Sequence, residues 1–182
     1  MKSLSFYSII FALVLFMAAC NGEEEPAAPA EEPIDDGVRT IELIGTDDMK
    51  FRVAEEADGL VIREQIGDEY EVDQILAEPG ETLRIVLTTR SELPPTAMSH
   101  NFALLHMGVD VDAFANASAV AADNEYIAPD MEDQVYVTTS MLGGGETETI
   151  EFDAPEEPGE YEFVCTFPGH FVAGMRGTLV VQ

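Results

Sequence analysis

The sequence is poor in positive charge, in thiols and in imidazoles. Its 182 residues include 8 lysines and arginines against 36 aspartates and glutamates, a formal net charge of -28. So few basic side chains argue against nucleic acid as a partner, because phosphate is bound by lysine and arginine. Two cysteines, Cys20 and Cys165, exclude a disulfide-stapled small fold, an iron–sulfur cluster and a four-cysteine zinc site. Since there are only three histidines, few kinds of metal site remain.

Long apolar runs are missing except at the start of the chain. Residues 4–19 are largely apolar and follow the single positive charge of Lys2. This run is shorter than the about 20 residues of a membrane-spanning helix, and it is typical of a secretory signal peptide over residues 1–19. The motif MAAC at 17–20 resembles a bacterial lipobox, which predicts an exported protein that is lipid-anchored through Cys20 at the periplasmic or cell-surface face of a membrane. The alternative is an ordinary signal peptide with Cys20 as a bystander.

Residues 20–37 form an acidic segment rich in proline, alanine and glutamate. The stretch NGEEEPAAPAEEPIDDG has one large apolar residue, Ile34, which is too little to bury. Proline and charge repulsion keep such a chain extended at about 3.1 Å per residue, so it would reach roughly 50 Å. We predict a tether that holds a domain of residues 38–182 away from the membrane.

The rest of the chain is dominated by short stretches with the pattern of β-strands. They cover residues 38–44, 49–53, 59–66, 70–76, 82–88, 101–105, 134–138, 148–152, 159–165 and 177–181. Turn sequences such as Pro79-Gly80 and Pro158-Gly159 separate several of them. Many short strands predict an all-β antiparallel sandwich or barrel. One alanine-rich stretch, 111–122, has apolar residues at helical spacing and predicts a helix.

The end of the chain carries four side chains that bind soft metals. Cys165 ends a predicted strand, His170 comes five residues later and Met175 five after that, while His100 lies far upstream. One thiolate, two imidazoles and a weak thioether are the ligands of a blue-copper electron-transfer centre. Met175 alone would be core filler and Cys165 alone a small buried hydrophobe, so the combination carries the prediction. The third histidine, His106, lies about 20 Å from His100 along an extended strand, too far to share the metal.

Three other kinds of metal protein use related ligands. An exported copper chaperone or storage protein would have exchangeable sites rich in methionine or histidine. A copper-oxidase domain would have a second cysteine in the loop after Cys165, or many more histidines. Structural zinc also fits one cysteine and two histidines.

These motifs resemble the azurin branch of the cupredoxins, including the auracyanin-type proteins, over about residues 38–182. The similar segments are CTFPGH at 165–170 followed by MRGTL, SHNF at 99–102 and GTDDMKF at 45–51. The resemblance implies a Greek-key β-sandwich or barrel of the cupredoxin type, with one short helical insertion at about 107–123.

The resemblance also implies the roles of the site residues. His100, Cys165 and His170 would be the equatorial ligands of one copper ion, Met175 the axial ligand, and the carbonyl of Ser99 a weak axial contact. Asn101 would brace the ligand loops, and the backbone N–H of Phe167 would be directed at the sulfur of Cys165. An apolar docking patch would surround an exposed edge of His170; it would be built from Met49, Met98, Leu142 and Pro168, with Phe171 and Val172 as open candidates.

The function implied is electron transfer by a protein that is not an enzyme. A monomer would take one electron from a membrane-bound donor and pass it to a terminal acceptor by Cu(II)/Cu(I) cycling. The partner on either side would be a cytochrome, a quinol-oxidising complex or an oxidase. The acidic clusters spread over the whole domain favour work in high salt, where repulsion is screened. Electrostatic steering toward a basic partner such as a cytochrome is the alternative.

Overall fold

The computed structural model describes residues 37–182, and its strands follow the alternation of apolar residues in the sequence. In β5, for example, Leu83, Ile85 and Leu87 are buried while the residues between them are partly exposed. The strands are β1 (Arg39–Thr46), β2 (Phe51–Val53), β3 (Leu60–Ile66), β4 (Glu69–Ala77), β5 (Thr82–Arg90), β6 (Ser99–His100), β7 (Ala103–Leu105), β8 (Val135–Thr138), β9 (Leu142–Gly143), β10 (Thr147–Asp153), β11 (Gly159–Val164) and β12 (Arg176–Val181). The helices are α1 (Val111–Ser118) and two 3₁₀ helices, η1 (Ala122–Asn124) and η2 (Pro129–Gln134).

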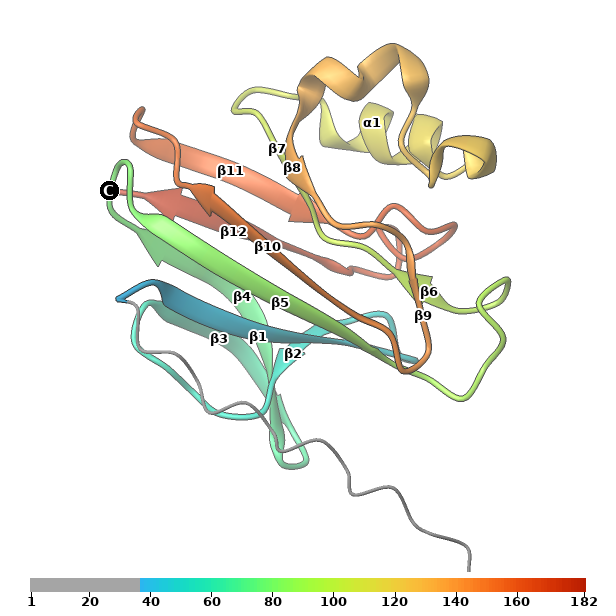
Figure 1. The fold of residues 1–182 in the computed structure, drawn as a ribbon, viewed down its shortest axis with the longest axis horizontal. Coiled ribbons are helices and arrows are strands. Elements are labelled where there is room, and N and C mark those ends of the chain that lie inside the picture. Colours follow the sequence, from blue (N-terminus) through green and yellow to red (C-terminus); the bar gives the residue numbers. More distant parts are fainter. Residues whose placement is uncertain (1–36) are drawn as a thin grey trace, which may run out of the picture. The chain divides into compact units, whose positions relative to one another are not determined.

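Ten of the strands form one sheet that curls toward a barrel (Figure 1). Its order is β10-β5-β1-β2-β4-β12-β11-β7-β8, with β3 added on β4. β1 runs parallel to β5, and β12 runs parallel to β4, while the other pairs of this sheet are antiparallel. β6 and β9 form a separate two-stranded ladder. This architecture, with one short α-helix, confirms the predicted all-β, cupredoxin-type fold.

The interior of the sheet is organised around three phenylalanines. The ring of Phe163 lies 5.6 Å from that of Phe51 and 5.0 Å from that of Phe102. Burying each such ring contributes about 2–3 kcal/mol to the stability of the fold. Gly177 on the neighbouring β12 leaves room for Phe163, since a Cβ atom there would lie 2.3 Å from the ring. The cluster includes Cys165 and Met175, so two of the four predicted metal ligands are part of the main core.

Two predicted strands begin two residues later in the structure, each after a polar turn or loop. The predicted strand 49–53 begins only at Phe51, because a turn closes between Thr46 and Met49, whose N–H donates to the Thr46 carbonyl at 2.8 Å. The predicted strand 101–105 begins only at Ala103. The N–H of Phe102 donates instead to Thr139 Oγ1, at 3.0 Å. The two-residue strands β6 and β9 were not predicted, since such short strands have no alternation to reveal them.

The predicted helical insertion is confirmed and covers one edge of the sheet (Figure 1). Its α-helix ends at Ser118, four residues earlier than the spacing over 111–122 predicted. Its helix starts at Asp110, whose carboxylate accepts the N–H of Ala113 at 3.1 Å, a standard N-cap. The insertion encloses a second apolar cluster. Its buried members are Ala103, Leu105, Phe114, Ala115, Ile127, Val164 and Phe171. Phe171 belongs to the loop between His170 and Met175, so the insertion also packs against that loop.

The predicted signal peptide, the lipidation site Cys20 and the tether as far as residue 36 lie outside the described residues. Within residues 37–182, no helix has both the length and the apolar character that crossing a membrane requires.

Candidate metal centre

Three side chains from distant parts of the chain meet in the interior. His100 Nδ1 and His170 Nδ1 are 3.1 Å apart, and Cys165 Sγ lies 3.4 Å from His170 Nδ1 and 3.8 Å from His100 Nδ1. All three residues are buried, with exposures of 2% or less. The structure therefore brings together the three predicted equatorial ligands, with one donor atom of each directed at a common point.

Ends of strands position these donors. His100 is the last residue of β6 and pairs with Leu142 of β9. Cys165 comes directly after β11, and Met175 comes directly before β12. The N–H of Cys165 donates to the Met175 carbonyl at 3.1 Å, which closes the base of the loop. Met175 is fully buried in the same core cluster as Cys165.

Short-range hydrogen bonds define the loop between Cys165 and Met175. The N–H of His170 donates to the Phe167 carbonyl at 3.1 Å, and the N–H of Met175 donates to the His170 carbonyl at 2.9 Å. Gly169 and Gly174 have φ angles of 87° and 94°, a region that residues with a Cβ adopt only with strain. Glycine at these two positions lets the loop turn sharply enough to return the chain to β12.

Asn101, which follows His100, is hydrogen-bonded through its side chain to Thr166, which follows Cys165. Asn101 Oδ1 accepts the N–H of Thr166 at 2.9 Å, and Asn101 Nδ2 donates to Thr166 Oγ1 at 2.9 Å. Both residues are buried, at 1% exposure each. Asn101 thus lies where it was predicted, between the two ligand segments. Its partner Thr166 was not predicted, because a threonine next to a cysteine carries no signal of its own.

Burial keeps the donor groups uncharged in the metal-free protein. Desolvation, and for His100 also the proximity of His170, lowers the pKa of each histidine to about 4. Desolvation raises the pKa of the Cys165 thiol to about 12, against a smaller lowering by the backbone N–H groups of Asn101 and Phe167. Neutral imidazoles have free lone pairs, so both histidines are ready to bind a cation. The thiol is not ionised by its surroundings, and a bound metal has to displace its proton.

The spacing and chemistry of the donors fit one copper ion. Donor atoms bound at about 2.0–2.3 Å in a trigonal plane lie roughly 3.5–3.7 Å apart, and the three observed separations are 3.1, 3.4 and 3.8 Å. The thiolate and the thioether of the buried Met175 are soft ligands that favour copper. His100, Cys165, His170 and Met175 therefore fit a single type 1 copper site.

Close packing against Gly45 restricts the ring of His100. His100 Nε2 is buried without a hydrogen-bond partner in the described part of the chain. A Cβ atom on Gly45 would lie 2.6 Å from the ring carbon Cδ2, a distance at which one of the two has to move. Gly45 is therefore a further residue on which the site depends, and the turn sequence that contains it gave no sign of this role.

We expect Gly45→Ala to displace the imidazole and to lower Cu(II) affinity at least about tenfold, since overpacking costs about 1–3 kcal/mol. Competition with a chelator measures the affinity. Gly67→Ala is the control, because a Cβ there meets no atom within 4 Å and only adds backbone strain at φ 66°. Equal affinities for Gly45→Ala and the unaltered protein would show that His100 does not depend on this contact.

The residues of the predicted docking patch are buried to different degrees. His170 is only 2% exposed, less than an exposed ring edge would suggest, and Met98 and Leu142 are 8% and 7% exposed. Pro168 is exposed and Met49 is half-buried. The sequence did not decide whether Phe171 or Val172 belongs to the patch. In the structure Phe171 is buried, whereas Val172 is 80% exposed.

Two aromatic contacts complete the surroundings of the site. Tyr126, from the helical insertion, lies 5.2 Å from the ring of Phe167, which in turn lies 4.8 Å from His170. Tyr126 has a φ of 58°, and the sequence gave no indication that it would reach the ligand loop. His106 is exposed and packs against Tyr136 at 5.3 Å, and it is not part of the group formed by His100, Cys165 and His170.

The barrel-like sheet and the His-Cys-His group beside a buried methionine define a cupredoxin-type blue copper protein. Residues 62–182 match the model of the copper-binding proteins of the plastocyanin/azurin family. The chain belongs to this family.

Individual relatives extend the comparison. Auracyanin-B of Chloroflexus aurantiacus is 41% identical over 85 residues, which cover 46% of this chain but only 36% of that protein. The chain thus spans about a third of this relative. Outer membrane protein H.8 of Neisseria gonorrhoeae is 28% identical over 173 residues, 91% of this chain and 92% of the relative. The crystal structure of dithionite-reduced auracyanin from Roseiflexus castenholzii superposes with a TM-score of 0.57 at 26% identity, covering 79% of this chain and 96% of that one.

Proposed function

We propose that this chain is a mononuclear electron carrier, not an enzyme, whose single copper ion is held by His100, Cys165, His170 and Met175. The proposal rests on two imidazole nitrogens and one thiol sulfur that are buried and lie within 4.8 Å of one another. They occur in a member of a copper-binding family. When bound, copper supplies a one-electron couple between Cu(II) and Cu(I).

Each ligand has a separate task. His100 and His170 offer neutral Nδ1 atoms, Cys165 would bind as a thiolate after losing its proton, and Met175 would be the fourth, more weakly bound ligand. The carbonyl of Ser99 would be a further, weak contact of the metal. Ser99 is buried and its hydroxyl donates to the Pro95 carbonyl at 2.8 Å, which fixes its orientation.

The surrounding hydrogen bonds keep the donor set in one arrangement. The Asn101–Thr166 bridge and the closure between Cys165 and Met175 hold the two ligand segments together. Ligands that cannot move when the electron arrives make reorganisation small, and such outer hydrogen bonds also tune the potential. With copper bound, such a restrained donor set would favour fast electron transfer.

Electrons pass through the His170 side of the molecule. Pro168 and Val172, each two residues from His170 along the chain, are exposed, and Met49 is half-buried. These three form the accessible part of a small apolar docking patch, while Met98 and Leu142 are almost fully buried. Such a patch suits a transient contact. The donor and the terminal acceptor are membrane-associated partners, each a cytochrome, a quinol-oxidising complex or an oxidase, and the protein works as a monomer without nucleic acid.

The visible spectrum of the purified chain after addition of one equivalent of Cu(II) tests the proposal. An electron carrier gives an intense blue thiolate-to-copper band that ascorbate bleaches and an added oxidant restores. A colourless protein that releases copper readily to a chelator would instead support a copper chaperone or storage protein. A colourless protein that holds zinc tightly would support a structural metal.

The proposed site of action is outside the cytoplasm, on a lipid anchor at Cys20. The motif MAAC at 17–20 supports the anchor, and the name of the relative outer membrane protein H.8 is consistent with a surface location. The mass of the mature N-terminal peptide tests this. A diacylglyceryl-modified Cys20 is expected, and an unmodified N-terminus would exclude the anchor.

The acidity of the chain reflects work in high salt. Six of the seven lysines and arginines in residues 37–182 form ion pairs with carboxylates, and these are Arg39, Lys50, Arg52, Arg63, Arg84 and Arg90. The remaining acids are left to repel one another, and salt screens this repulsion.

We expect the melting temperature to rise by about 4 °C or more between low and molar NaCl, as screening removes about 2 kcal/mol of repulsion. Thermal unfolding followed by circular dichroism measures it. A melting temperature that stays flat would favour the alternative, in which the acids steer a basic partner and the association rate falls with salt instead.

A further inference from the structure

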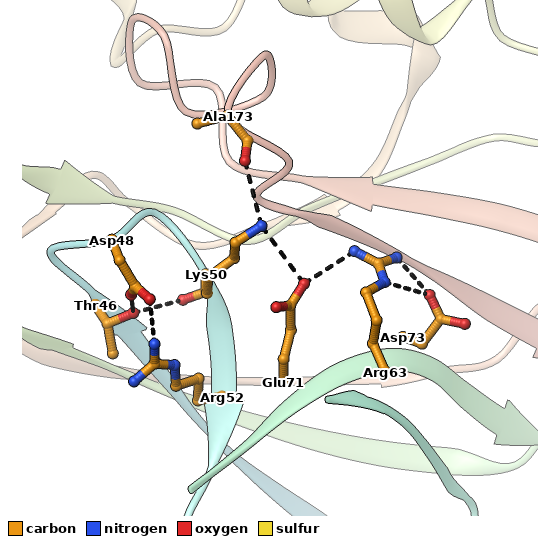
Figure 2. A network of polar contacts seen from close by, with 8 residues as sticks. All are labelled: Thr46, Asp48, Lys50, Arg52, Arg63, Glu71, Asp73 and Ala173. Carbon is orange, nitrogen blue, oxygen red and sulfur yellow. Dashed lines mark hydrogen bonds and ion pairs between the residues drawn. The ribbon is translucent and has the colours of Figure 1, made fainter. Parts of the chain in front are cut away.

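The only lysine in residues 37–182 touches the loop that carries the proposed copper ligands. Lys50 lies just before β2, yet its Nζ donates to the carbonyl of Ala173, 123 residues further on, at 3.2 Å. Figure 2 shows the side chain spanning the gap between the two segments. Ala173 is one of the four residues between His170 and Met175, so this contact reaches the segment that joins two of the four donors.

The ammonium group is held in place from the opposite side. Glu71 of β4 has a side chain only 5% exposed, and its Oε1 lies 3.6 Å from Lys50 Nζ and 2.9 Å from Arg63 Nη1. Arg63 is in turn paired with Asp73 (Figure 2). A buried carboxylate is stabilised by nearby cations, so Glu71 attracts Lys50 from the side opposite Ala173.

The loop is shaped to receive this side chain. Gly174 has a φ of 94°, and a Cβ atom there would lie 3.0 Å from Lys50 Nζ. The N–H of Ala173 is used inside the loop, donating to the Gly169 carbonyl at 3.0 Å, while its carbonyl accepts from Lys50. Ala173 itself is exposed, so the lysine, more than burial, restrains this part of the segment.

We propose that Lys50 is a positioning residue, a latch between β2 and the ligand loop that fixes the segment from His170 to Met175 and thereby the axial methionine. The inference rests on the proposed copper-binding function for its effect on the metal. The latch itself is a property of the metal-free chain, so it is tested separately from that function.

Three variants of the purified protein separate the latch from general charge effects. Lys50→Met removes the donor and the charge. Arg63→Met removes a charge of the same network that also binds Glu71 but does not touch the loop. Lys50→Arg restores a charged donor.

Hydrogen exchange of the metal-free protein is the first measurement, because it does not depend on copper. In Lys50→Met, the amides of Ala173, Gly174 and Met175 are expected to exchange about tenfold faster, which corresponds to the loss of one charge-assisted hydrogen bond. The same amides are expected to stay within about twofold of the unaltered protein in Arg63→Met and Lys50→Arg. Equal acceleration in Lys50→Met and Arg63→Met, or no acceleration in either, would overturn the latch.

The electron paramagnetic resonance spectrum of the Cu(II)-loaded protein is the second measurement, because it reports the axial contact. Lys50→Met is expected to shift the spectrum and to release copper to a chelator about tenfold faster, and Lys50→Arg is expected to restore both. Faster exchange without any change of spectrum or release rate would show that the latch does not position Met175. A colourless unaltered protein would contradict the proposed function, while the exchange data would still decide the latch.

Acetylation of the folded protein covers the case in which Lys50→Met does not fold. An amine-specific reagent modifies Lys50 in the unaltered protein but not in Lys50→Arg, and all other amines are the same in both. Faster loop exchange only in the acetylated unaltered protein supports the latch, and identical exchange in the two acetylated proteins overturns it.

Discussion

Replacing Cys165 with serine is expected to abolish the blue band of the copper-loaded protein and to weaken copper binding by more than about a hundredfold. The loss of a ligand should exceed the roughly 10- to 100-fold loss that is typical when only a hydrogen-bond partner of a ligand is removed. The band arises from charge transfer between a thiolate sulfur and Cu(II), and a serine oxygen does not provide it. A serine hydroxyl also ionises far less readily than a thiol, so the site would lose its one anionic ligand. Absorption in the visible range and chelator competition measure the two effects.

The other cysteine provides the matched control. Cys20 lies in the predicted lipobox and has no place in the proposed site, so Cys20→Ser is expected to keep the band. Serine is close to cysteine in size, and Cys165 is fully buried, so Cys165→Ser should fold with an unchanged circular dichroism spectrum. A blue band that persists in Cys165→Ser, or that disappears in Cys20→Ser, would remove the thiolate assignment.

The metal-free protein is expected to lose stability as the pH falls from about 7 toward 4. His100 and His170 have pKa values of about 4 in the folded state and about 6.5 in the unfolded chain. Between these values the unfolded chain binds more protons than the folded one, so the free energy of unfolding rises with pH. Each histidine contributes up to about 3 kcal/mol, fully present above pH 6.5 and lost as the pH falls through 4. Urea unfolding at a series of pH values measures this dependence.

The pH range is chosen so that the titration of the Glu69 and Glu81 carboxylates does not contribute to the slope of the unfolding free energy. Arginine partners lower the pKa of Glu69 and Glu81 below the ordinary value of 4.5, so their contribution is lost only in more acidic solution. Between pH 5 and 7 the slope then reports the two histidines. His100→Gln is expected to reduce the slope by about half. A flat profile in this range would mean that the folded state does not exclude protons from the histidine pair.

The metal ligands could be predicted because their chemistry is uncommon and local. Cys165, His170 and Met175 lie within eleven consecutive residues, and few structural roles call for a thiol, an imidazole and a thioether at that spacing. His100 was a remote fourth candidate, and the resemblance to the azurin branch implied its role as an equatorial ligand. The alternation in strands such as β5, and the helical spacing in residues 111–122, likewise fixed the fold class in advance, because side-chain periodicity is a property of local chain geometry.

Contacts between distant segments could not be predicted from the sequence. No local pattern reveals that Gly45 has to remain small for His100, that Thr166 binds Asn101, or that Lys50 reaches Ala173. Each depends on the sheet order, which places β2 near the ligand loop and β6 beside β9. The depth of burial was also misjudged for His170, because the exposure of a ring depends on how neighbouring loops close over it.

The amino-acid sequence by itself thus determined the donor chemistry and the class of fold, since both follow from residue types and short-range periodicity. Tertiary structure alone decided which donors point at one another, how deeply they are buried and which side chains restrain them. The physical reason is that hydrogen bonds, steric contacts and desolvation act through space. Residues 65 positions apart, such as His100 and Cys165, come within 3.8 Å only when the sheet has formed.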